Sequence, residues 1–174
     1  RGVLGMVPGE LMTTDEGYAT GINTDEDILK IAVVERHNYT GHIGIGYIKG
    51  YGLKSGAVAT SISHDSHNII VVGTNDEDMA AAVNHIAENG GGITVFDGGK
   101  CIGDVKLGIA GLMSDAPLID VNRNLEDAKV RAFELGVSKL IDPFMTLSFM
   151  SLPVIPKLRL TTRGVFDVES QSYV

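Results

Sequence analysis

Two histidines flank an aspartate in the sequence HDSHN, which lies between two apolar runs of the chain. Histidine changes its charge near neutral pH and a carboxylate can orient an imidazole, so His64, Asp65 and His67 are candidates for a proton relay in catalysis. Ser66 and Asn68 carry hydrogen-bonding groups and are candidates for substrate binding. The alternative is a structural turn in which aspartate and asparagine side chains bond their own backbone, and residue types alone favour this turn.

The same cluster could hold a metal ion only if the chain brought His64 and His67 together. In an extended strand the two side chains would point to opposite faces, whereas a turn could make them converge. Asp65 is the only local third ligand, and structural zinc sites have four ligands. A self-contained metal site is therefore disfavoured, and we predict that no residue of this chain binds a metal.

A second charged group, Glu35-Arg36-His37, lies where the apolar run that begins at Ile28 ends. Glu35 and Arg36 are candidates for contacts with a substrate. The alternative is a plain ion pair between these two side chains, which at a protein surface contributes little to stability.

Missing motifs exclude several kinds of enzyme. Zinc deamination of the cytidine-deaminase type needs an H-x-E and a P-C-x-x-C element, and Cys101 is the only cysteine. The zincin helix H-E-x-x-H and the nucleophile elbow G-x-S-x-G are absent. The glycine-rich segment 41–56 has neither the spacing of a Walker loop nor that of a dinucleotide-binding loop, so its glycines indicate tight turns and close strand packing.

Composition limits the class of protein further. A chain of 174 residues fits one domain with a single core. Its 14 Lys and Arg against 22 Asp and Glu leave a net charge of −8, which disfavours nucleic acid as a partner. No run approaches the roughly 18 apolar residues of a membrane span, so no membrane partner is expected. The single cysteine excludes an intrachain disulfide and favours the cytoplasm, with Cys101 as a thiol in the core.

The pattern of elements predicts an α+β fold, with helices packed on a mixed, largely antiparallel sheet in a single domain. Short runs rich in β-branched residues predict strands at 28–35, 43–48, 56–62, 68–74, 91–96 and 102–109, the last two forming a hairpin around a DGG turn. Asn75 should cap a helix that ends at Gly90. Pro117 should open a second helix, which ends at Gly136.

The start of the chain carries a weaker pattern. Residues 1–24 show no periodicity, so we predict a lead-in segment or linker outside the core, with the domain proper at residues 25–174. The chain opens at Arg1 rather than at a methionine, which leads us to expect a fragment of a longer protein.

The C-terminal part is apolar but is interrupted by Pro143, Pro153 and Pro156, which favours short strands and loops over one long helix. The apolar segments Val3 to Met12 and Phe144 to Val154 lack the periodicity of a core element. We therefore expect them to leave an exposed apolar patch through which the chain forms a homo-oligomer.

Four segments together carry a family resemblance: KIAVVERHNYTGHIGIGYIKGYGLKSGAVATSISHDSHNIIVVGTNDEDM, GGGITVFDGGK, LGIAGLMSD and DPFMTLSFMSLPVIPKLRLTTRGVFDV. In this order they resemble the C-terminal domain of bacterial and archaeal adenine deaminase, of the amidohydrolase superfamily. The blocks HDSHNIIVVGTNDEDM and PFMTLSFMSLPVIPKLRLT are long and specific to that family.

The resemblance implies an enzyme that hydrolyses adenine to hypoxanthine and ammonia in purine salvage. It also implies a binuclear manganese or iron centre in an N-terminal TIM-like barrel, built around an H-x-H pair, later histidines and an aspartate. This chain has no H-x-H and is too short for the roughly 250 residues of a barrel, so that barrel is the expected partner. We expect the chain alone to hold no cofactor and to be inactive. His64, Asp65 and His67 then supply a proton path; the alternative is a non-catalytic binding or oligomerisation module that caps the barrel.

Overall fold

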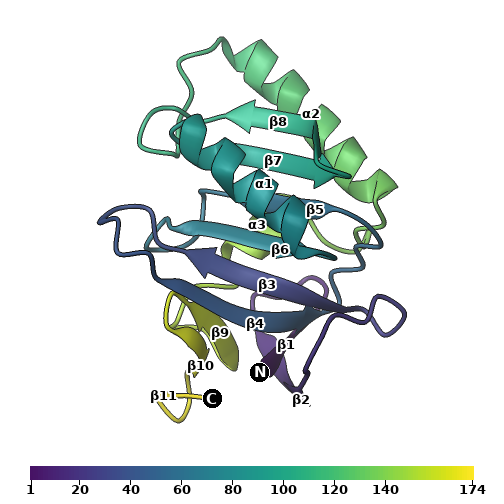
Figure 1. Ribbon diagram of the computed structural model, residues 1–174, viewed down its shortest axis with the longest axis vertical. Helices are drawn as coiled ribbons and strands as arrows, with labels where there is room; N and C mark the ends of the chain where they lie inside the picture. The colour runs from purple at the N-terminus through teal and green to yellow at the C-terminus, as the bar shows by residue number, and fades with distance from the viewer.

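The computed structural model describes all 174 residues and has an eight-stranded sheet, a three-stranded sheet and three helices (Figure 1). The large sheet contains β1 (Gly2–Met6), β2 (Thr13–Tyr18), β3 (Ile28–Val34), β4 (Ile43–Lys49), β5 (Ala57–Thr60), β6 (Ile69–Gly73), β7 (Gly92–Asp97) and β8 (Lys100–Lys106). The helices are α1 (Asp76–Glu88), α2 (Leu118–Glu134) and α3 (Pro143–Ser148). The small sheet contains β9 (Leu158–Thr161), β10 (Gly164–Asp167) and β11 (Ser172–Tyr173).

The large sheet has the strand order β2-β1-β4-β3-β6-β5-β7-β8. Only β1 and β4 pair in parallel, and every other neighbouring pair is antiparallel. The predicted class, an α+β fold on a mixed and largely antiparallel sheet, is therefore confirmed. None of the helices is long and apolar enough to cross a membrane.

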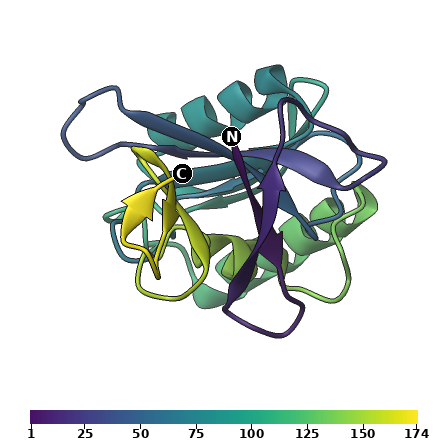
Figure 2. The same ribbon diagram turned by 90° about the horizontal axis from the view of Figure 1, so that it is seen from below.

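The helices cover both faces of the large sheet, with α1 on one face and α2 and α3 on the other (Figure 2). The alternation of side chains along β6 shows why. Ile69 and Val71 pack in the cluster of α1, whereas Ile70 and Val72 pack in the larger cluster of α2 and α3. Because both faces are covered, β6 is a continuous apolar run rather than an alternating one.

The ends of α1 are those that the sequence predicts. The Asn75 side chain accepts the N–H of Asp78 at 2.7 Å, and Gly90 just beyond the helix has φ +75°. The Asp78 carboxylate in turn accepts N–H bonds from Gly98 and Gly99 in the turn between β7 and β8. Both glycines have positive φ, as a two-residue hairpin turn of type I′ requires.

The expectation that residues 1–24 stay outside the core is wrong. All of β1 is buried, and Leu4 belongs to the main core cluster. Val3, Leu4 and Gly5 pair in parallel with Tyr47, Ile48 and Lys49 of β4. The strand is five residues long and apolar throughout, so it has no period-2 signal, and β4, the strand that ties it into the sheet, lies more than 40 positions away.

The C-terminal region confirms the absence of one long helix but adds the short helix α3, which the sequence analysis missed. The Asp142 side chain accepts the N–H groups of Phe144 and Met145, and Pro143 occupies the first helical turn, where its missing N–H costs nothing. The proline that seemed to interrupt a helix therefore begins one. The strands β9 and β10 then pack against β4, where Gly44 leaves room for the backbone of Thr161.

The predicted apolar patch is largely absent. Phe144 and Leu147 are buried in the chain's own core, as are Val3 and Leu4 at the other end. The large apolar side chains of these two segments that stay exposed are Leu11, Met12, Met145 and Val154.

Cys101 is exposed, so its predicted place in the core is wrong. It lies on the edge strand β8, which has a bulge: Val95 pairs with Gly103, but the next residue of β7, Phe96, pairs with Cys101. Ile102 is the extra residue. The bulge turns Cys101 to the face of the sheet that carries α1, at the open edge.

Candidate functional site

The HDSHN sequence forms the connection between β5 and β6, and it is a turn. The N–H of His67 donates to the Ser63 carbonyl at 2.6 Å, and the N–H of His64 donates to the Ser148 carbonyl at 2.9 Å. The hydroxyl of Ser151 donates to the His64 carbonyl at 3.1 Å. The turn is therefore fixed to the end of α3 and to the loop that follows it.

Arg36 fixes the other side of this turn. Its Nε donates to the His67 carbonyl at 2.6 Å, and its Nη2 donates to the Ala110 carbonyl at 2.8 Å. The Arg36 N–H donates to Asn68 Oδ1 at 3.3 Å, while Asn68 Nδ2 donates to the Ser66 hydroxyl at 3.1 Å. Two of the four predicted substrate-binding residues, Arg36 and Asn68, thus hold the turn in place.

Glu35 shapes the loop that follows β3. Its carboxylate accepts the N–H groups of His37, Asn38 and Thr40 at 2.6, 2.7 and 3.0 Å, and the Thr40 hydroxyl at 3.1 Å. These bonds, the one from the Thr40 N–H most of all, lower the pKa of Glu35 to about 2. No ion pair joins Glu35 to Arg36, so that alternative is wrong.

His64 and His67 lie close together, with ring centroids 5.5 Å apart in an edge-to-face arrangement. The His64 ring also packs on Phe149, with centroids 4.7 Å apart. His64 Nδ1 and Asp65 Oδ1 are 4.0 Å apart, too far for a hydrogen bond, and the Asp65 side chain is 85% exposed. The turn brings the two histidines together, as one of the interpretations predicted, but it leaves the aspartate free.

His67 differs from its neighbours in the turn in its hydrogen bonding, its backbone conformation and its pKa. Its Nδ1 atom is buried and has no hydrogen-bond partner, and its backbone has φ +52°, a left-handed conformation that is uncommon outside glycine. Burial lowers the pKa of His67, and the neighbouring charges of His64 and Arg36 lower it further. The imidazole is therefore neutral at neutral pH and can accept a proton.

Acidification is expected to destabilise the chain in two separate pH ranges. The pKa of His67 lies below its ordinary 6.5 in the folded chain, so the unfolded chain takes up protons first and stability falls as the pH drops through 6.5 towards the folded-state pKa. The pKa of Glu35 falls from 4.5 to about 2, so its contribution is lost between those two values. Melting temperatures should be measured from pH 8 to pH 2 for wild type, His67→Asn and Glu35→Gln. His67→Asn should lose the pH dependence below 6.5 and Glu35→Gln the dependence below 4.5, and identical pH profiles for all three proteins would contradict this prediction.

A cleft of about 300 Å³ adjoins the turn, at the small end of the range of ligand sites. Asp65, Ser66 and Asn68 line it together with the loop from Ser151 to Val154. Of the five residues predicted from HDSHN, these three line the cleft, and His64 and His67 do not. Sequence reasoning missed the contribution of the 151–154 loop because a loop after a short helix carries no signal of its own.

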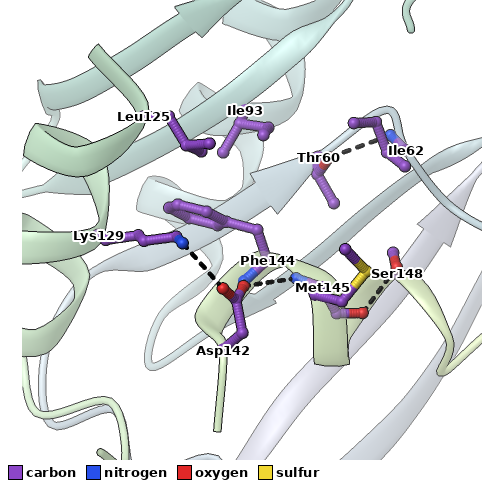
Figure 3. Close-up of a pocket in the computed structure, with 9 residues that line it drawn as sticks. All are labelled: Thr60, Ile62, Ile93, Leu125, Lys129, Asp142, Phe144, Met145 and Ser148. Atoms are coloured by element: carbon purple, nitrogen blue, oxygen red, sulfur yellow. Dashed lines mark hydrogen bonds and ion pairs between the residues drawn. The ribbon is translucent and has the colours of Figure 1, made fainter. Parts of the chain in front are cut away.

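A second, apolar pocket of about 180 Å³ lies between α2, α3 and the sheet (Figure 3). Leu125, Ile93 and Phe144 supply its apolar lining, and Lys129 Nζ lies 3.0 Å from Asp142 Oδ2 at its side. The pair is an inter-helix contact: Asp142 caps α3, and Lys129 joins that cap to α2. This pocket is smaller than ordinary ligand sites and its polar groups are paired, so it is a packing feature.

The turn does not fit a binuclear manganese or iron centre. Such a centre needs several nitrogen and oxygen ligands around two ions, and no three metal-ligating side chains of the turn converge. His37 Nε2 bonds the Ser66 carbonyl at 2.6 Å, and His64 packs on an aromatic ring. The chemistry that this turn can perform is proton transfer and hydrogen bonding.

The fold and the turn define an α+β domain with a titratable turn beside a polar cleft, and comparison with known proteins places it in a family. Residues 9–172 match the family model described as the adenine deaminase C-terminal domain. The chain is 48% identical to adenine deaminase 2 of Carboxydothermus hydrogenoformans over 99% of its own length, and 52% identical to adenine deaminase of Bacillus subtilis over 87%. It spans 31% and 26% of those relatives. The chain belongs to the adenine deaminase C-terminal domain family.

Proposed function

We propose that this chain acts as the C-terminal domain of a cytoplasmic adenine deaminase of the amidohydrolase superfamily, in purine salvage. The complete enzyme converts adenine and water to hypoxanthine and ammonia. The observation that carries the proposal is 48% identity over 99% of the chain to a protein named adenine deaminase 2. The remaining two thirds of such a protein has room for the barrel that would hold manganese or iron.

In this proposal the turn supplies a proton path to the reaction. Hydrolysis adds water at C6 of adenine and expels ammonia, so one proton must leave the attacking water and another must reach the amine. A neutral His67 with an unpaired Nδ1 can take up a proton, and the Asp65 side chain in the same turn is exposed to solvent. Arg36 donates to the carbonyl of His67 and so fixes the backbone that carries the ring.

The cleft is the face that we assign to the catalytic domain. It combines the polar groups of Ser66 and Asn68 with the exposed apolar side chain of Val154. Leu11 and Met12, also exposed, lie beside the same loop, because the Thr13 N–H donates to the Pro156 carbonyl at 3.0 Å. Exposed apolar side chains gathered beside a cleft are typical of a surface that another domain covers, because covering them removes apolar area from water.

The isolated chain is expected to show no deamination of adenine with added manganese or iron, because its turn cannot hold a binuclear centre. Ammonia and hypoxanthine should appear only when the N-terminal domain is supplied, either fused or as a separate chain. The control is the complete protein assayed with the same metals. Metal-dependent production of hypoxanthine by the pure 174-residue chain would contradict the proposal.

The second candidate is a non-catalytic module that caps the barrel or joins copies of the enzyme. The exposed apolar side chains of Leu11, Met12 and Val154 favour it, since a homo-oligomer could bury them. Light scattering of wild type and of the variant Leu11→Ser/Val154→Ser distinguishes the two roles. Self-association that the double substitution abolishes supports a module that joins copies, and a monomeric wild type removes that role and leaves the cap.

A further inference from the structure

A side-chain cluster on the opposite side of the fold from α2 and α3 combines His85 of α1 with Cys101 and Asp104 of β8. One ligand atom from each of the three lies within 4.8 Å of the other two. His85 Nε2 is 3.1 Å from Asp104 Oδ1 and 3.9 Å from Cys101 Sγ. Imidazole nitrogen, thiolate sulfur and carboxylate oxygen are the three ligand types that zinc-class ions take in proteins.

The bulge in β8 creates this cluster. Residues three apart on a regular strand point to opposite faces, so Cys101 and Asp104 would be separated. Ile102 is the extra residue, and as a result Cys101 pairs with Phe96 while Asp104 pairs with Thr94. Residues directly opposite on paired strands share a face, and Phe96 faces α1 in the cluster that contains Met79 and Ile86. Both ligands therefore face the helix that carries His85.

The hydrogen bonding around His85 is unsatisfied without an ion. Its Nε2 lies 3.0 Å from Asn89 Nδ2, a donor, and 3.1 Å from Asp104 Oδ1, an acceptor. One ring nitrogen cannot accept from the first and donate to the second at the same time. Asp104 Oδ1 is in fact buried with no hydrogen-bond partner. A cation between the nitrogen, the carboxylate and the sulfur would satisfy all three.

We propose that His85, Cys101 and Asp104 bind one divalent transition-metal ion of the zinc class. Binding displaces the thiol proton to solvent and leaves a neutral imidazole, a thiolate and a carboxylate around the ion. The two negative charges balance the two positive charges. Three protein ligands leave a fourth position for water, and the sulfur ligand selects against the harder magnesium and calcium.

A catalytic cysteine–histidine pair is the alternative for the same residues, and the structure argues against it. Burial raises the pKa of the Cys101 thiol, and the nearby Asp104 carboxylate raises it further, so the metal-free thiol is protonated and a poor nucleophile. None of the three residues lines the cleft beside the HDSHN turn or the apolar pocket between α2 and α3.

The ion would join the edge strand of the sheet to a helix. The strand β8 pairs only with β7, and α1 crosses β7 beside it (Figure 1). A metal bridge from β8 to α1 constrains this edge, so binding should raise the melting temperature of the chain by a few degrees.

Cobalt(II) titration of the metal-free 174-residue chain under reducing conditions tests the proposal. We expect one equivalent to bind, with a thiolate-to-cobalt charge-transfer band in the near ultraviolet that zinc then displaces, and with the rise in melting temperature. Cys101→Ser should remove the band. His85→Gln and Asp104→Asn should each weaken cobalt binding by more than roughly 10- to 100-fold, the loss expected when a residue that only hydrogen-bonds to a ligand is replaced. His42→Gln, at an exposed histidine on another loop, is the matched control and should bind as wild type does.

Three results would overturn the proposal: no charge-transfer band, a band that persists in Cys101→Ser, or equal affinity in His85→Gln and wild type. Circular dichroism of each metal-free variant establishes that it is folded. Asp104→Asn preserves the side-chain shape and keeps the thiol, so it separates loss of a ligand from loss of the fold.

Discussion

Arg159→Met is expected to destabilise the chain by about 3–5 kcal/mol, because each buried carbonyl that loses its hydrogen-bond donor costs roughly 1–3 kcal/mol. The Arg159 side chain is fully buried, and its guanidinium donates to the carbonyls of Phe149, Leu11, Ile155 and Pro156. Methionine fills a similar volume but removes the donor from all four carbonyls, and those of Leu11 and Ile155 then have no other hydrogen-bond donor in the chain. Urea unfolding followed by circular dichroism measures the loss.

Arg159→Lys is the matched control for this substitution. Burial lowers the pKa of Arg159 to about 10, so the native group is charged at neutral pH, and lysine preserves that charge. The lysine ammonium has three donors and lacks the planar arrangement of N–H groups of a guanidinium. Arg159→Lys should therefore keep part of the stability that Arg159→Met loses, but not all of it. A loss below about 1 kcal/mol in Arg159→Met would show that water replaces the guanidinium at these carbonyls.

His67→Asn is expected to lower kcat of a complete adenine deaminase that contains this domain by roughly 10²-fold, the contribution of a positioned acid-base group. Asparagine tolerates the left-handed backbone at this position, and the His67 ring makes no hydrogen bond within the chain, so the turn should persist. Steady-state kinetics from pH 5 to pH 9 should show the acidic limb of the profile altered in the variant.

Metal content and melting temperature of the same protein separate catalysis from structure. Both should stay close to wild type if His67 transfers protons, and His42→Gln should leave kcat unchanged. Full turnover combined with a lower melting temperature would make the turn structural. The domain would then act as a cap for the barrel.

The sequence predicts those parts of the fold whose signals are local. Asn75 and Gly90 mark the ends of α1 by their side-chain and backbone chemistry, and the two glycines of the DGG turn determine the hairpin of β7 and β8. The strands from β3 to β6 are recognisable because β-branched runs alternate with polar connections. These signals depend only on residues a few positions apart.

The missed parts depend on distant partners. The strand β1 is in the core because β4 pairs with it, and nothing within residues 1–24 indicates this. The exposure of Cys101 follows from a one-residue bulge on an edge strand, which hydrophobic patterning does not show. The hydrogen-bond partners of Glu35 and Arg36 could not be predicted for the same reason: they are backbone groups of loops, which have no sequence signature.

The contact between Thr13 and the segment 157–158 also has a consequence for how the chain is made. The Thr13 hydroxyl donates to the Leu158 carbonyl, 145 positions along the chain, and accepts the N–H groups of Lys157 and Leu158. At the pace of translation, residues 157–158 emerge on the order of 10 s after Thr13. Until then the Thr13 hydroxyl cannot form these three hydrogen bonds. If a ribosome stalls before residues 157–158 emerge, the edge strand β2 stays without these contacts and is open to pairing with neighbouring nascent chains. We therefore expect the risk of strand exchange between copies to be high during this interval.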